Sequence, residues 1–276
     1  MKQEEEHMAY KVVLSARRKR EKSLHKTDLD KTKEIKKSLV KVFFISRDLE
    51  LPYYNDRFDL QKGDRVYVSG KLYGHMGIVT EVNYCFKIKL SDYERVTALV
   101  DTTVKGEFYG IGSDFITFAP GTLPYKKVRS WLKPPEHFPV EYACGSESKS
   151  FSLEELPALK LDEEEKAKGE YLFENERVRY LAVCGTSGKA LVVGSKLYEI
   201  EFRYENGRIT NLFCSCYETG YCGHSLAVML KLRQILDCIE KDYEQEYKKS
   251  GCFCVVNKAL LLNFSVKNKE KGKIIL

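Results

Sequence analysis

The sequence predicts an α+β fold, in which a small β-barrel-like N-terminal domain precedes a C-terminal module built from a β-hairpin and a helix. Three observations predict this fold. Residues 41–118 contain short runs of β-branched and aromatic residues that Gly and Asp separate, as in a small barrel or curled sheet. Asn206-Gly207 lies between two alternating apolar segments, which is typical of a hairpin. After residue 222, apolar residues recur at helical spacing.

The other elements follow in chain order. Residues 119–160 are rich in proline and predict an irregular surface connection, which the sole tryptophan, Trp131, is expected to fasten to a domain. A helix is expected over 161–177, with Asp162 as its N-cap. Strands follow up to the hairpin at 197–213, and the amphipathic helix covers 222–240. Residues 241–276 are expected to add two C-terminal strands.

The net positive charge of the chain is confined to its N-terminal segment. The whole sequence has 46 basic and 40 acidic side chains, and residues 1–41 contain 13 basic and 7 acidic ones, so this segment accounts for the net charge of +6. Residues 141–176, in contrast, contain 11 acidic and 4 basic side chains. We expect residues 1–40 to form a basic arm that binds phosphates through counterion release, with a solvated or disordered leader as the alternative. Its proposed contacts are Arg17, Arg18, Lys19, Arg20 and Lys22.

Composition and missing motifs narrow the function. The sequence has no stretch of about 18 apolar residues and no apolar secretory signal, so we expect no membrane association. An odd number of cysteines, nine, indicates a reducing, cytoplasmic location, where clustered cysteines favour metal binding over disulfides. The sequence lacks P-loop, H-E-x-x-H and G-x-S-x-G motifs. We therefore expect no enzymatic activity and no small-molecule substrate.

Four metal-binding residues lie close together in the pattern C-x-C-x5-C-x-H: Cys214, Cys216, Cys222 and His224. Residues two apart on a strand project to the same side, so the first two cysteines can face one ion. Gly220 lets the chain turn back to the last two ligands. Three thiolates and one imidazole form a closed tetrahedral set that suits one structural zinc ion, with incidental buried cysteines as the alternative.

The remaining cysteines are predicted to be ordinary thiols. Cys252 and Cys254 are two apart on an expected strand but have no second pair beside them, so buried or edge thiols are favoured over metal ligands. The isolated cysteines are expected to behave as small apolar residues. They are Cys85, Cys144, Cys184 and Cys238.

Residues from about 194 to 236 resemble the SWIM-type zinc finger, in which C-x-C, a variable spacer and C-x-H lie between a β-hairpin and an amphipathic helix. The resemblance implies zinc binding. It also implies a role in DNA or protein interaction, because such modules occur in Swi/Snf-type ATPases, Mutator-type transposases and ubiquitin-pathway proteins. More loosely, the whole chain is similar to bacterial SWIM proteins with a small barrel before the finger.

Residues 63–82, GDRVYVSGKLYGHMGIVTEV, resemble the KOW motif of ribosomal and transcription-elongation proteins, although the segment before Gly70 is one residue shorter. KOW-like barrels often contact RNA or DNA, so the resemblance implies that Arg65 and Lys71 contribute to nucleic-acid binding. The alternative is that the glycines only form the turns of the sheet.

These observations lead to a primary functional hypothesis: the chain is a non-catalytic zinc protein that binds nucleic acid. DNA is the nucleic acid that we expect it to bind. Two alternatives remain open. The acidic segment and the hairpin would dock on a partner in a protein-interaction adaptor. In the other alternative, the chain is the regulatory N-terminal part of a Swi/Snf-type ATPase or a transposase system.

Overall fold

The computed structural model describes residues 36–87, 89, 92–136, 139–147, 150–158, 161–218 and 220–265. These residues form two compact units. The smaller unit contains residues 36–103 and 129–136, and the larger contains 104–128 and the described residues from 139 onward. Residues 1–35 of the predicted basic arm, with its contacts from Arg17 to Lys22, lie outside the described residues, whereas the last residues of the predicted arm, from Ser38 on, belong to strand β1.

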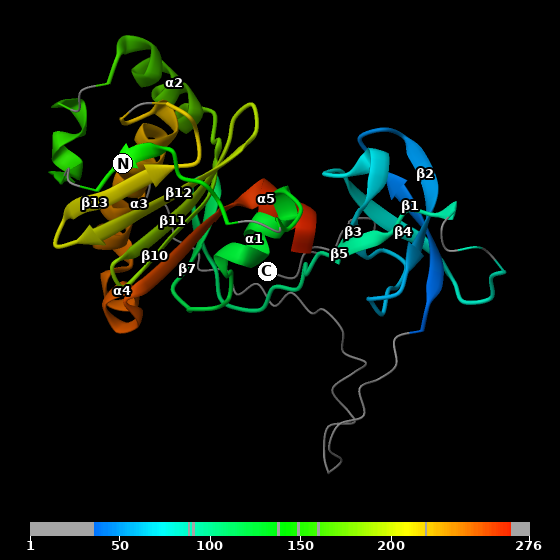
Figure 1. Cartoon of the computed structure of the whole chain (residues 1–276). Coiled ribbons are helices and arrows are strands. Elements are labelled where there is room, and N and C mark those ends of the chain that lie inside the picture. Colours follow the sequence, from blue (N-terminus) through cyan, green and yellow to red (C-terminus); the bar gives the residue numbers. More distant parts are fainter. Residues whose placement is uncertain are drawn as a thin grey trace, which may run out of the picture. The chain divides into compact units, whose positions relative to one another are not determined.

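The smaller unit is a five-stranded antiparallel sheet with the strand order β2-β1-β4-β3-β5 (Figure 1). Its strands are β1 (Ser38–Phe44), β2 (Leu49–Asn55), β3 (Arg65–Val68), β4 (Met76–Asn83) and β5 (Val96–Leu99). Alternate residues, among them Val40, Val42 and Phe44, are buried and form the core of this unit. The sheet is not a closed barrel. Within the described residues, the two edges of the sheet are joined by a single parallel bridge, between Tyr54 and Arg95. Strand β5, at one edge, is only four residues long.

The larger unit contains a nine-stranded antiparallel sheet, in the order β6-β7-β14-β10-β11-β12-β13-β8, with β9 also paired to β13. The strands are β6 (Tyr109–Ile111), β7 (Asp114–Thr117), β8 (Cys144–Ser146), β9 (Phe151–Ser152), β10 (Val178–Cys184), β11 (Ser187–Val193), β12 (Leu197–Glu205), β13 (Arg208–Cys214) and β14 (Cys252–Asn257). Helix α3 (Gly223–Asp242) packs against β10 to β13, and α2 (Glu163–Glu174) packs against α3 (Figure 1). No helix in the described ranges is long and apolar enough to cross a membrane.

The local signals of the C-terminal module are confirmed. The Asp162 carboxylate accepts a hydrogen bond from the Glu165 amide at 2.7 Å and so caps α2. Asn206 and Gly207 both have positive φ, as the tight turn of the β12–β13 hairpin requires. The apolar face predicted for α3 is buried against the sheet. It consists of Val228, Leu232, Ile235 and Ile239.

Two segments in the first part of the chain differ from the prediction. Strands β6 and β7, expected in the N-terminal barrel, belong to the larger sheet, because β7 pairs with β14 from the far end of the chain. The proline-rich connection contains helix α1 (Tyr125–Leu132), strands β8 and β9, and a 3-10 helix at Leu153–Ala158. Trp131 does fasten this segment within the smaller unit, since its indole N–H donates to the Asp101 carbonyl at 2.8 Å.

Up to Ser265, where the described residues end, the C-terminal segment forms two short helices and one strand rather than two strands. Helix α4 (Glu244–Ser250) precedes β14, and α5 (Lys258–Ser265) follows it directly. Leu260, Leu261 and Phe264 are buried on one side of α5. A short apolar run of this kind fits a strand or a buried helix equally well, which explains the wrong prediction.

Candidate metal centre

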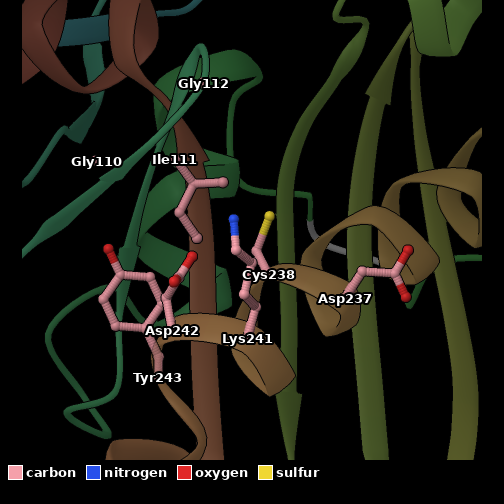
Figure 2. Close-up of a pocket in the computed structure, with 8 residues that line it drawn as sticks. All are labelled: Gly110, Ile111, Gly112, Asp237, Cys238, Lys241, Asp242 and Tyr243. Carbon is pink, nitrogen blue, oxygen red and sulfur yellow. The ribbon is translucent and has the colours of Figure 1, made fainter. Parts of the chain in front are cut away.

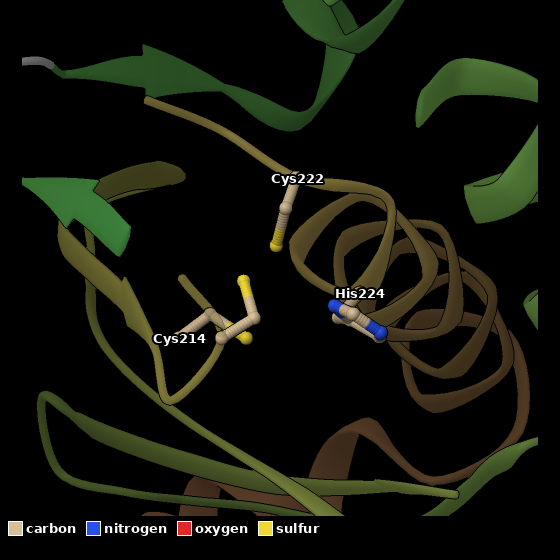
Figure 3. Close-up of side chains that lie close together, drawn as sticks. Cys214, Cys222 and His224 are labelled. Carbon is tan, nitrogen blue, oxygen red and sulfur yellow. The ribbon is translucent and has the colours of Figure 1, made fainter. Parts of the chain in front are cut away.

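The four predicted ligands meet where the β12–β13 hairpin joins helix α3. Cys214 is the last residue of β13, Cys216 follows it, and Cys222 is the N-cap of α3, with His224 in the first turn. Their ligand atoms all lie within 4.8 Å of one another. Figure 3 shows the labelled side chains of Cys214, Cys222 and His224 gathered between the end of the hairpin and the start of the helix.

The chemistry of this cluster fits a tetrahedral zinc ion. Zn–S bonds of about 2.3 Å place sulfur ligands roughly 3.8 Å apart, which is compatible with the observed spread. All four side chains are at most 4% exposed, so the site is closed to bulk water. Nδ1 of His224 is buried and has no hydrogen-bond partner among the described residues. A buried imidazole nitrogen without a partner is costly, and the set of donors around it is one that zinc prefers.

Residues outside the cluster hold the ligands in place. The Cys222 sulfur accepts a hydrogen bond from the Ser225 amide at 3.5 Å, which caps the helix. The His224 ring stacks on Tyr198 of β12, with 3.7 Å between centroids. Glu165 of α2 accepts a hydrogen bond from the Gly223 amide at 2.5 Å. The first turn of α3 is therefore attached both to the sheet and to α2.

Two of the three thiols in the cluster, those of Cys216 and Cys222, are biased toward the metal-binding form, whereas the pKa of Cys214 is raised by its hydrogen bonds with them. Hydrogen bonds from the thiols of Cys144 and Cys214 lower the pKa of Cys222, and the same two thiols lower the pKa of Cys216 to about 5. Thiolates are the species that bind metal, so these two cysteines are the strongest candidates for charged ligands.

Sequence reasoning missed Cys144. It was expected to be an isolated apolar residue, but it is fully buried and is the register partner of Cys214 across the β8–β13 ladder. Its thiol donates to the Gly220 carbonyl, inside the ligand loop, at 3.0 Å. No local pattern marks this position, because Cys144 and Gly220 are 76 residues apart in the chain.

The other cysteines divide into different classes. Cys184 and Cys252, expected to be free thiols, form a disulfide because they are register partners on β10 and β14. Cys254 is a buried free thiol, as predicted. Cys85 is exposed rather than packed as a small apolar residue.

The predicted nucleic-acid contacts Arg65 and Lys71 lie in the smaller unit, on β3 and on a 3-10 helix at Gly70–Leu72. Lys71 is exposed, and the neighbouring Tyr73 is 56% exposed. Arg65 is partly buried, and this burial lowers its pKa. Of these three residues in the KOW-like segment, Lys71 and Tyr73 therefore face the solvent.

A pocket of about 290 Å³ lies at the far end of α3 (Figure 2). The turn between β6 and β7 forms one wall, and the last residues of α3 form the other. Figure 2 shows Cys238 and Lys241 projecting from the helix toward Ile111. Burial raises the pKa of Cys238, so its thiol is neutral near pH 7, unlike the thiolate that a nucleophilic cysteine requires.

No protein-family model, curated protein or solved structure matches this chain. The assignment of the metal centre therefore rests on the donor atoms, their burial and their spacing.

Proposed function

We propose that this chain is a non-catalytic zinc protein in which one structural zinc ion binds Cys214, Cys216, Cys222 and His224. The proposal is supported by one observation above all: four buried donors of the types that zinc prefers lie within 4.8 Å of one another. Their order between a β-hairpin and a helix agrees with the SWIM-type resemblance. Four protein ligands complete a tetrahedron, so no coordination position is left for a substrate.

Metal analysis of the purified chain tests this proposal. We expect about one zinc ion per chain in the wild type and almost none in Cys222→Ser, because the variant loses a ligand of a closed set. Cys254→Ser is the matched control, since Cys254 is also a buried free thiol but lies on β14. Full zinc occupancy in Cys222→Ser would contradict the ligand assignment.

We further propose that the zinc fixes the shape of a nucleic-acid-binding protein, with DNA as the expected partner. Two exposed pairs of a cation and an aromatic ring support this. Lys71 and Tyr73 are two residues apart in the KOW-like segment and are both exposed, Tyr73 at 56%. In the ligand loop, Tyr217 is 77% exposed, and Lys196 Nζ lies 5.2 Å from its ring centroid. Such pairs combine phosphate attraction with a stacking surface for bases.

Fluorescence anisotropy with labelled single-stranded DNA, duplex DNA and RNA, at low and near-physiological salt, tests nucleic-acid binding. A chain that lacks residues 1–35 keeps β1 whole and isolates the contribution of the basic arm. We expect Lys71→Ala to reduce the salt slope on duplex DNA by about 0.9, which corresponds to one lost phosphate contact. Tyr171→Ala on α2 is the control, because Tyr171 is similarly exposed but lies among acidic residues.

Failure of the full chain to bind any of these nucleic acids, even at low salt, would favour the adaptor function. The acidic helix α2, which carries Glu163, Glu164 and Glu170, is the surface that this alternative uses. Stoichiometric capture of one protein at moderate salt would support it. A partner with ATPase or transposase activity would indicate the regulatory role.

A further inference from the structure

The metal centre has more soft donors than a zinc ion can use. Besides the four ligands, the buried thiol of Cys144 on strand β8 reaches the loop that carries them, where it donates to the Gly220 carbonyl. Cys144 and Cys214 are direct partners across the antiparallel β8–β13 ladder, so their side chains lie on the same face of the sheet. Structural zinc takes four ligands, and the centre therefore has one thiol in addition.

Cys144 and Cys214 lie opposite each other on neighbouring strands at the candidate site. Both side chains are fully buried, so neither thiol has water as a competing partner. A change from one thiol to the other would therefore move the donor by one strand of the sheet.

Cys144 is also attached to the ligand loop itself. Its thiol donates to the carbonyl of Gly220, at 3.0 Å, and Gly220 lies between the two pairs of ligands. Partners that hydrogen-bond to metal ligands or to the loop that carries them fix ligand orientation, and their loss typically reduces metal affinity by about 10–100-fold. The position of Cys144 therefore supports the site even while Cys214 is the ligand.

We propose that Cys144 is the fifth donor of the metal centre: it supports the ligand loop when Cys214 binds the ion, and it replaces Cys214 as the third thiolate when Cys214 is lost. This inference rests on the proposed zinc site. It goes beyond that site by assigning a metal-binding role to a residue outside the C-x-C-x5-C-x-H pattern.

Cobalt(II) titration of the full chain tests the inference, because the thiolate-to-cobalt charge-transfer absorption increases with the number of thiolate ligands. The wild type is expected to show three thiolates and one imidazole. Cys144→Ala keeps that spectrum but binds Co²⁺ about 10–100-fold more weakly in competition with a chelator. Cys214→Ala also keeps three thiolates, since Cys144 takes the vacated position. The double variant Cys144→Ala/Cys214→Ala falls to two.

The outcomes separate this inference from the proposed function. A wild-type chain that binds no Co²⁺ or Zn²⁺ would refute the metal site itself. A wild type with three thiolates and a Cys214→Ala variant with only two would overturn the role of Cys144 alone. If far-UV circular dichroism shows that Cys214→Ala is unfolded, Cys144→Ala still decides, because an affinity equal to the wild type overturns the inference. Cys254→Ala, which removes a buried thiol elsewhere, should change neither affinity nor spectrum.

Discussion

Gly223 lies between two of the proposed zinc ligands and permits a close approach of helices α2 and α3. A Cβ atom added at Gly223 would lie 2.7 Å from the Glu165 carbonyl oxygen and 2.9 Å from the Gly169 amide nitrogen. Both are backbone atoms of α2, so they cannot move aside as a flexible side chain would. Gly223→Ala therefore forces α2 away from the first turn of α3.

The expected loss of stability follows from these contacts. Overpacking of a well-packed site costs about 1–3 kcal/mol. The displaced hydrogen bond between the Gly223 amide and the Glu165 carboxylate adds about 1.5–3 kcal/mol. The higher helix propensity of alanine offsets up to about 1 kcal/mol. We expect the free energy of unfolding of the larger unit to fall by about 1.5–5 kcal/mol, and Co²⁺ affinity to fall with it, because Cys222 and His224 flank the substitution.

Urea denaturation of the zinc-loaded protein, followed by far-UV circular dichroism, measures this change. Trp131 belongs to the smaller unit, so its fluorescence provides a separate signal that should not shift. Gly110→Ala is the matched control: its nearest neighbour would be Lys258 Nζ at 3.6 Å, an ordinary contact. Glu165→Gln removes the charge from the hydrogen bond without adding a Cβ. Wild-type stability in Gly223→Ala would refute the argument from close packing.

Three further predictions concern other parts of the larger unit. A zinc chelator should make the larger unit sensitive to proteolysis while the smaller sheet survives, and simultaneous cleavage of both would show that they do not unfold separately. Lys231→Met should destabilise the chain by about 3–5 kcal/mol, since Asp114 is left buried without its ion-pair partner, whereas combining it with Asp114→Leu should restore stability in a double-mutant cycle. Alkylation and mass spectrometry without reductant should leave Cys184 and Cys252 linked, and two labelled thiols there would contradict the disulfide.

The Asp114–Lys231 pair also has a defined pH dependence. Burial raises the pKa of Asp114 above 3.8 despite the attraction of Lys231. A carboxyl with a raised pKa binds more protons in the folded state than in the unfolded state. Its contribution to stability therefore falls as the pH rises from about 3.8 through the native pKa. Chemical denaturation between pH 3.5 and roughly pH 7 should show this fall in the wild type and not in the Asp114→Leu variant.

The Cys/His cluster was predictable from the sequence because its four residues are close together in the chain. The tight turn at Asn206-Gly207, the apolar spacing of α3 and the ligand pattern all lie in one continuous segment, so chain geometry alone brings the donors together. Gly169, the glycine inside α2, can be read from the sequence, but the reason why a glycine is needed there cannot. A Cβ at Gly169 would lie 2.7 Å from Leu226 Cδ2, a contact that exists only once α2 packs on α3.

Pairing between distant strands was not predictable. Whether β7 joins the first or the second sheet depends on β14, whose Val255 is the register partner of Ile116. Both are apolar residues that suit any buried strand, so composition does not select the partner. The same limitation concealed Cys144, because only the β8–β13 register places it beside Cys214.

These non-local contacts change what the zinc ion is expected to stabilise. A hairpin–helix finger alone would lose only its own fold on metal removal. Here Tyr198 stacks on His224, Glu165 contacts the first turn of α3, and Cys144 binds the ligand loop, so β12, α2 and β8 all meet at the ligands. The binding free energy of a structural zinc is folding free energy for whatever the site connects. The ion should therefore stabilise the neighbouring strands β12, β13 and β8 together with α2, rather than the hairpin–helix finger by itself.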